Sequence, residues 1–226
     1  MTKRNVFKVF VVLMTALTVI ALQPVTATAQ KSGIEITPTY SYMWAGSFET
    51  IDGTINLKDG SQYGGILSYP VASGGGAKTF VELSYAYLSS TATFSSYFVG
   101  KPSVLDGLNL DVSVQYFQLS GIQQFNKGKA QPFIGLGAGA VLFHPKQSTF
   151  NTYPTQDVWR MAFNFTAGLK VELSETIALR LQGRLFLPVY FTGGGIFVGT
   201  GGASVGVSAA IPIVQGDVGL GLAITL

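Results

Sequence analysis

The chain has 226 residues, of which 47% are hydrophobic and 11% are charged, and it contains no cysteine. The absence of cysteine excludes a lipoprotein anchor, a disulfide framework and a thiolate metal site. The formal net charge of +3 comes from Lys3, Arg4 and Lys8. Without these three residues the bases and acids balance, so the charge gives no reason to expect a nucleic-acid partner.

Residues 1–29 have the organisation of a secretory signal peptide. The basic residues precede an apolar run at 9–22, and Ala27-Thr28-Ala29 is a small-residue cleavage site. The alternative is an uncleaved anchor helix, but the apolar run is too short to span a bilayer comfortably. We expect cleavage before Gln30, which leaves residues 30–226 as one domain.

The rest of the chain alternates large apolar residues with small or polar residues, which is the pattern of strands with one apolar face. In chain order, the expected strands are 34–44, 62–71, 78–89, a strand that begins near 108, 131–143, 158–173, 177–191 and 215–226. The last strand has the clearest alternation, and its apolar residues are Val218, Leu220, Leu222, Ile224 and Leu226.

The fourth expected strand has an ambiguous pattern. Val112 and Val114 alternate with Asp111 and Ser113, so we expect the valines to face outward and the polar residues inward. The alternation shifts at Tyr116-Phe117, which suggests a bulge or the membrane interface.

The connections between these strands fall into two classes that alternate along the chain. Those after the second, fourth and sixth strands are short, and the long ones lie at 45–61, 90–107, 144–157 and 192–214. Transmembrane β-barrels have this arrangement, with short periplasmic turns and long external loops.

The longest uncharged run, 185–216, does not suit a spanning helix, because Pro188, Pro212 and the glycines at 193–195 interrupt it. An apolar chain without spanning helices satisfies its backbone hydrogen bonds in lipid only as a closed barrel. The expected fold is therefore all-β: an eight-stranded antiparallel up-and-down transmembrane β-barrel.

Two segments leave the strand count open. Residues 203–213 have strand composition, but Pro212 suits a central strand poorly, so we assign them to a folded external loop. A ten-stranded barrel would need another strand within 47–57, where Ile55 and Leu57 are candidates.

The sequence resembles the small outer-membrane β-barrel domain proteins of Gram-negative bacteria, the OmpA/OmpX-like eight-stranded group. Three stretches carry the resemblance: 132–139 in the fifth strand, the hairpin from Phe163 to Arg184, and 219–223 in the closing strand. It implies an outer-membrane location and dependence on the barrel assembly machinery, but no common reaction. Such chains commonly end in an aromatic residue, whereas this one ends in Leu226.

The charged residues expected inside the barrel form the first candidate site. The alternation directs five acids and four bases inward: Glu35, Glu82, Asp111, Glu172, Asp217, Arg160, Lys170, Arg180 and Arg184. An eight-stranded barrel is only wide enough for side chains to fill it, which favours a paired polar core over a gated ion path. Inward glycines at 135, 137 and 139 are expected to make room for the arginines.

Aromatic residues near the long-loop ends form a second group, which we interpret as an interfacial girdle in preference to a carbohydrate-stacking site. They are Tyr40, Tyr42, Trp44, Tyr85, Tyr87 and Trp159.

The single histidine, His144, lies at the external end of the fifth strand. Ser148 is near in sequence, and Asp157 could orient the ring, but nothing in the sequence establishes a catalytic arrangement. We therefore expect no catalytic residues, no cofactor and no metal site.

The sequence favours an integral outer-membrane barrel with a structural or small-solute passage role. We expect a monomer that contacts outer-membrane lipid. The alternatives are a lipid-modifying enzyme and a surface adhesin or receptor that binds through its external loops.

Overall fold

The computed structural model describes residues 33–49, 53–96, 109–125, 128–146, 157–199, 202–210 and 214–226. The expected signal peptide, 1–29, lies outside this part of the chain. Among the described residues, no helix has the length and apolar character needed to cross a membrane. The secondary structure consists of strands joined by turns and loops.

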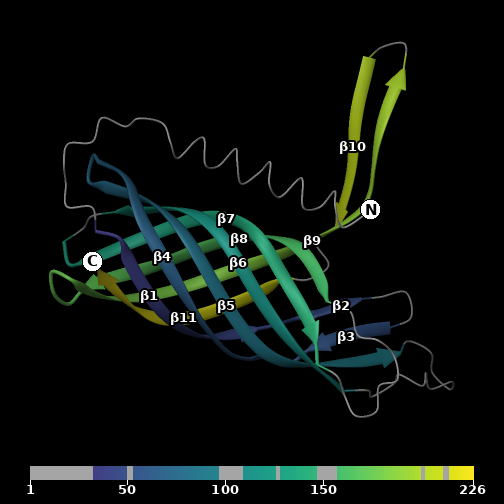
Figure 1. The fold of residues 1–226 in the computed structure, drawn as a ribbon, viewed down its shortest axis with the longest axis horizontal. Helices are drawn as coiled ribbons and strands as arrows, with labels where there is room; N and C mark the ends of the chain where they lie inside the picture. The colour runs from purple at the N-terminus through teal and green to yellow at the C-terminus, as the bar shows by residue number, and fades with distance from the viewer. Residues whose placement is uncertain are drawn as a thin grey trace.

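Eight antiparallel strands form a closed ring in the order β4-β1-β11-β9-β8-β7-β6-β5, and pairing between β5 and β4 closes it (Figure 1). This confirms the predicted eight-stranded, all-β barrel. The ring strands are β1 (Glu35–Trp44), β4 (Gly60–Gly74), β5 (Ala77–Ser96), β6 (Asn109–Phe125), β7 (Ala130–Pro145), β8 (Val158–Glu172), β9 (Ile177–Gly199) and β11 (Gln215–Thr225).

Three further strands lie outside the ring, at the end with the long loops (Figure 1). β2 (Ser47–Glu49) pairs with β3 (Gly53–Leu57), and β3 pairs with the last residues of β5. β10 (Gly202–Ala210) pairs with the end of β9 to form a hairpin that projects beyond the barrel. The described residues of the segments that raised the possibility of ten strands are therefore extended, but they do not enter the ring.

The opposite end of the barrel has the short turns. Gly75 and Gly76 have positive φ angles of 60° and 80° between β4 and β5, a conformation that glycine adopts without strain. Between β8 and β9, the hydroxyl of Ser174 accepts a hydrogen bond from the amide of Ile177 (3.0 Å). The start of β1 pairs with the end of β11 here, so the closing strand removes the last open edge.

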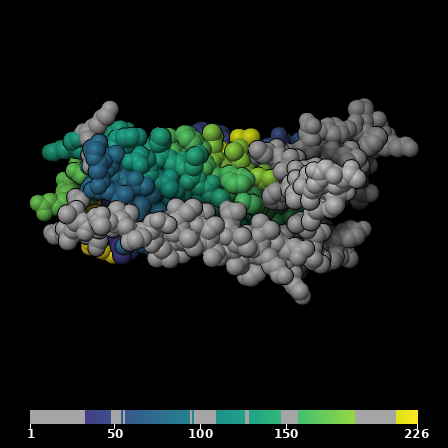
Figure 2. All heavy atoms as spheres, turned by 90° about the horizontal axis from the view of Figure 1, so that it is seen from above, coloured from purple at the N-terminus to yellow at the C-terminus, as the bar shows by residue number. Residues whose placement is uncertain are grey.

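The side-chain alternation has the predicted facing in seven of the ring strands. In β9, for example, Arg180 and Arg184 are buried inside the barrel, and Leu181 and Leu185 are exposed on its outer face. The described strands form one elongated body (Figure 2). Apolar side chains are exposed along much of its outer wall. These seven strands therefore direct apolar side chains to the exterior, and the interior holds the buried charges.

The predicted facing of β6 is wrong. Val112, Val114 and Tyr116 are buried inside, and Asp111 faces outward and is exposed. The pairing of β6 with β5 and β7 runs through Phe117 without a shift, so there is no bulge at this point. The loop-end half of β6 lies beside outward-facing polar residues of β5 and β7. Its own polar face therefore turns outward with them, and its apolar face fills the barrel interior.

Candidate functional site

Three ion pairs lie in the barrel interior. Lys170 on β8 pairs with Glu35 on β1, and Arg184 on β9 pairs with Asp217 on the neighbouring β11. Arg180 on β9 spans the interior to Glu82 on β5, with two parallel hydrogen bonds of 2.6 and 2.9 Å. All six side chains are buried. Buried charges require such pairing because desolvation otherwise destabilises them strongly.

Uncharged polar side chains complete the two arginine sites. The hydroxyl of Ser68 donates to Glu82 (2.9 Å), and Arg180 Nε donates to Gln182 Oε1 (2.8 Å). In the same way, Ser41 donates to Asp217 and to Gln62 Oε1, at 3.0 Å each. The carboxylates thus accept hydrogen bonds beyond the ion pair, which satisfies more of their lone pairs.

Aromatic rings pack against the cations. Arg180 lies 4.3 Å from the ring centroid of Phe133, and Lys170 lies 5.7 Å from that of Phe80. Phe80, Ile122 and Phe133 form a small apolar cluster beside these charges. The turn-end half of the interior is therefore filled by ion pairs and the rings that cover them.

The loop-end half of the interior has a different content, an apolar plug. It comprises Met43, Ala45, Leu57, Ala86, Leu88, Val112, Val114, Tyr116, Val141, Ala162 and Phe186. Tyr116 stacks on Phe186 with ring centroids 4.2 Å apart, and its hydroxyl donates to Gln215. The amide of Gln215 donates to the carbonyl of Ala45 (2.7 Å), so the plug has a hydrogen-bonded boundary with the charged half.

The other three residues of the expected interior network lie apart from these pairs. Asp111 faces outward, as described above, and accepts a hydrogen bond from Thr91 (3.3 Å). Glu172 is exposed at the turn end, where it accepts from Gln131 (2.6 Å). Arg160 is half-buried near the loop end and donates to the carbonyl of Trp159 (2.9 Å). The nine charges therefore do not form a single network.

The inward glycines of β7 make room for neighbouring side chains, and the expectation that they accommodate arginines is wrong. A Cβ atom on Gly137 would lie 2.1 Å from Ser120 Oγ and 2.3 Å from Asn164 Oδ1. Ser120 and Asn164 hydrogen-bond to each other at this point. Gly137 thus permits a polar contact between β6 and β8 across β7.

Most of the predicted girdle aromatics lie on the outer wall. Tyr40, Tyr42, Trp44, Tyr85 and Trp159 are exposed, and Tyr87 is half-buried. Sequence reasoning omitted Tyr63, which contacts Tyr40 (5.3 Å), and Phe117, which lies between Tyr85 (5.1 Å) and Trp159 (5.9 Å). With the correct facing of β6, the sequence would have placed Phe117 on the outer wall among these aromatic residues.

Polar residues cover the outer wall of β5 to β8 on the loop side of this aromatic group. His144 Nδ1 lies 2.6 Å from Asp157 Oδ1, the pairing considered from the sequence, and Ser148 lies outside the described residues. Lys146 Nζ donates to Ser89 Oγ (3.3 Å). Ser113, directly opposite His144 in the β6–β7 register, donates to the main-chain carbonyl of His144 (3.5 Å).

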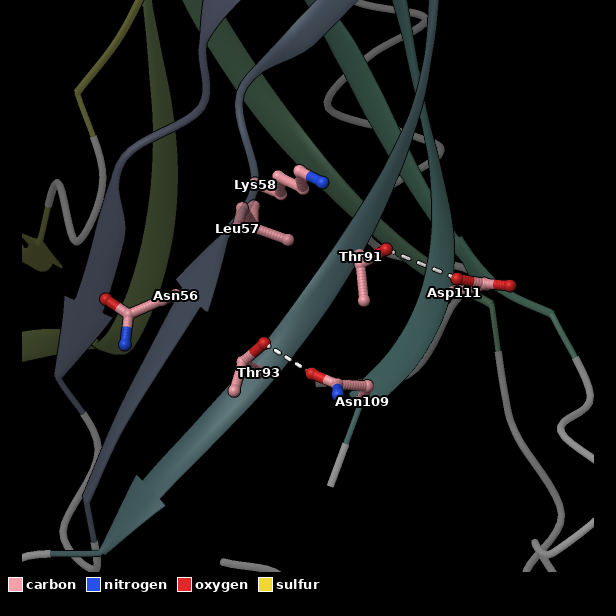
Figure 3. A pocket seen from close by; sticks show the side chains of 7 residues that line it. All are labelled: Asn56, Leu57, Lys58, Thr91, Thr93, Asn109 and Asp111. Atoms are coloured by element: carbon pink, nitrogen blue, oxygen red, sulfur yellow. Dashed lines mark hydrogen bonds between the residues drawn. The ribbon is translucent and has the colours of Figure 1, made fainter. Parts of the chain in front are cut away.

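An open groove of about 530 Å³ adjoins this surface. It lies where β3, β5 and β6 meet beyond the ring, and it is lined by Asn56, Leu57, Lys58, Thr91, Thr93, Asn109 and Asp111 (Figure 3). Thr93 donates to Asn109 (2.8 Å) across its floor. No group of three or more potential metal-binding side chains occurs in the described part of the chain.

Comparison with known proteins finds similarity at the level of fold. Neither a protein-family model nor a curated protein matches the sequence. Similar solved structures include Neisserial surface protein A, with 9% identity, a TM-score of 0.48, and coverage of 88% of this chain and 99% of that one. The outer membrane protein OprG from Pseudomonas aeruginosa has 14% identity and a TM-score of 0.48, with coverage of 87% of this chain and 98% of that one.

The outer membrane protease OmpT from Escherichia coli also matches, with 5% identity and a TM-score of 0.43, over 86% of this chain and 96% of that one. By their names, these proteins are a surface protein, an outer membrane protein and a protease, so they do not share one function. At these identities and scores, the likeness transfers neither a role nor a site residue to this chain.

Proposed function

We propose that the chain is a structural β-barrel of a bacterial outer membrane whose interior is closed to solutes. The membrane location is supported by the distribution of side chains. Leu83 and Leu136 on the outer wall are 53% and 68% exposed, while Arg180 and Glu82 are buried inside. This distribution is the reverse of that in a soluble barrel and suits a wall that contacts lipid.

The dimensions of the ring also suit a bilayer. β1 has 10 residues, and a tilted strand needs about 9–11 residues to cross the hydrocarbon core. Ring closure pairs every strand on both sides, so the backbone polar groups are satisfied without water.

The contents of the interior carry the proposal that the barrel is closed. Three buried ion pairs fill the turn-end half, and fully buried side chains such as Leu88, Val114 and Tyr116 fill the loop-end half. A permeating ion would have to separate the ion pairs and then pass an apolar constriction, which is a barrier even when it is wide enough for water. These features favour a structural role over small-solute passage.

Two measurements test this proposal in sequence. Insertion should give heat-modifiable migration in detergent and retention in outer-membrane fractions, whereas a protein that stays soluble without detergent would refute the membrane location. Planar-bilayer recordings of the inserted barrel should then show no steady openings. Steady openings that change when Arg184 or Asp217 is replaced would refute closure and favour passage of a small solute.

One observation favours a second candidate, a lipid-modifying enzyme. The Nδ1 atom of His144 faces Asp157 at 2.6 Å, which leaves Nε2 free as a base, and Ser113 is the directly opposite residue on β6. The hydroxyl of Ser113 is buried and bonds to a main-chain carbonyl. Mass spectra of lipid from cells that express the protein would support an enzyme only if a new product appears and is lost with His144→Ala.

A further inference from the structure

An exposed aromatic strip crosses the outer wall where the apolar surface ends. Tyr85, Phe117 and Trp159 contact one another in sequence, although β7 separates the strands of Phe117 and Trp159. The small side chain of Ala140, opposite Phe117 on β7, permits this contact. Amphipathic and flat rings at this position suit the boundary between acyl chains and headgroups.

Hydrogen-bond donors begin directly beyond the strip. The hydroxyl of Tyr85 donates to Gln115 (3.1 Å), and the next outward residue on β6 is Ser113, beside Ser89 and His144 in the strand register. Within the described part of the chain, Lys146 Nζ has no carboxylate partner, and His144 Nε2 has no hydrogen bond. The ammonium is thus available to an anionic oxygen at headgroup height, and Nε2, which is an acceptor when Nδ1 donates to Asp157, is available to a hydroxyl.

The groove of Figure 3 continues this surface away from the membrane. Lys146 and Asp111 are joined by a main-chain hydrogen bond (2.7 Å), so the lysine lies at the edge of the groove that Asp111 lines. On the opposite side, Lys58 is exposed, and its ammonium has no ion pair or hydrogen bond with any described residue. The lining alternates carboxylate, amide, hydroxyl and ammonium groups, which suits a ligand rich in hydroxyl groups.

We propose that the aromatic strip, the Lys146–His144 surface and the groove together bind one phosphorylated glycolipid of the outer leaflet. This inference rests on the proposed membrane location. The acyl chains would lie against the strip and the phosphate at Lys146, beside which His144 Nε2 would accept a hydrogen bond from a hydroxyl of the headgroup. The sugar would enter the groove, where Asp111 accepts hydrogen bonds from hydroxyls and Lys58 donates to ring substituents or a second phosphate.

The mixture of charges selects this ligand over simpler lipids. Asp111 and Asp157 lie near Lys146 and His144, so a bare phosphate meets repulsion as well as attraction. A phosphate-only lipid leaves the groove empty, and a neutral sugar leaves Lys146 without an anion. A headgroup that carries both sugar and phosphate satisfies all of these groups at once.

The test uses the folded barrel in phosphatidylcholine nanodiscs doped with a bisphosphorylated, acylated glucosamine disaccharide. Lys146→Gln and Lys58→Gln should each weaken retention of this lipid about tenfold, as expected for loss of one charge-assisted hydrogen bond. Lys129→Gln is the matched control, because Lys129 is an exposed lysine in the turn at the opposite end of the barrel. It should leave retention unchanged.

Chemically simpler probes separate the parts of the site. With the dephosphorylated disaccharide lipid, Lys146→Gln should leave lipid retention unchanged. Phosphatidylglycerol should bind weakly, and Lys58→Gln should leave its retention unchanged. Free inorganic phosphate at millimolar concentration should not displace the glycolipid, because it lacks the sugar and acyl contacts.

Two results would overturn this inference: equal retention by Lys146→Gln, Lys58→Gln and Lys129→Gln, or retention of phosphatidylglycerol as strong as that of the glycolipid. Failure to insert into nanodiscs at all would instead contradict the proposed function. An inserted barrel without lipid selectivity contradicts only the lipid site.

Discussion

The two halves of the barrel interior solve the problem of filling a narrow ring in opposite ways. The turn-end half holds Lys170, Arg180 and Arg184 with their carboxylate partners, whereas the loop-end half holds an apolar plug around Leu88 and Val114. The outer wall shows the reverse order: apolar side chains surround the charged half, and serine, histidine and lysine surround part of the plug.

On the membrane location proposed above, this reversal marks where lipid ends. In lipid, the outer wall must be apolar, so the polar residues of each strand turn inward and pair. Beyond the aromatic strip, the outer wall faces polar surroundings, and the ordinary preference for an apolar interior returns. β6 crosses this boundary, with Val112 and Val114 inside at one end and Gln118 and Ser120 inside at the other.

The charged half should be the most sensitive to loss of a single partner. Arg180→Leu leaves Glu82 buried without its cation, which should lower the free energy of unfolding by about 3–5 kcal/mol. Urea unfolding in lipid vesicles measures this change. Arg180→Leu combined with Glu82→Leu removes both charges and should recover much of the loss. Equal destabilisation by the single and double variants would show that Arg180 acts by packing and not by compensating charge.

The apolar half should respond to cavities and not to charge pairing. Leu88→Ala should lower the free energy of unfolding by about 2–5 kcal/mol, because Leu88 is completely buried in the plug. The neighbouring Ser89 faces outward, so Ser89→Ala should change the free energy of unfolding by less than about 0.5 kcal/mol. If Ser89→Ala were the more damaging substitution, the assignment of the plug to the interior would be wrong.

The outer wall of the charged half gives a test of lipid contact. Leu181→Arg places a charge on the apolar wall and should destabilise the barrel by about 2–4 kcal/mol near the middle of the bilayer. Gln115→Arg, on the outer wall beyond the strip, should have a much smaller effect. The comparison is made by unfolding both variants in the same vesicles, and equal effects would place the lipid boundary elsewhere.

Sequence alternation was sufficient to predict the ring and the facing of strand segments that lie in the apolar zone. β9 and β11 have charged or small residues on one face and leucine or valine on the other, so only one orientation suits lipid. The alternation could not predict which buried charges form ion pairs with each other. Arg180 and Glu82 are separated by 98 residues and lie on strands that are not neighbours in the ring.

The error in β6 has a general cause. Alternation identifies which residues share a face, but the surroundings decide which face is inside. Val112 lies on the loop side of the aromatic strip, where the outer residues of β6 are polar, and its side chain is buried inside. The outward polar cluster was partly visible, because His144 and Asp157 were considered as a pair, but the contributions of Ser89 and Lys146 depend on the register between β5, β6 and β7.

The smallest effect on stability is expected at the β9–β10 hairpin. Among the described strands, β10 pairs only with β9, beyond the last residues of the ring. Replacement of residues 194–207 by a two-residue Asn-Gly turn should therefore change the free energy of unfolding by less than about 0.5 kcal/mol. A larger loss would mean that the hairpin supports the barrel. Because the trimmed barrel should remain folded, attachment of cells to surfaces can be compared directly between the two proteins. Lost attachment would support the adhesin alternative, and unchanged attachment would count against it.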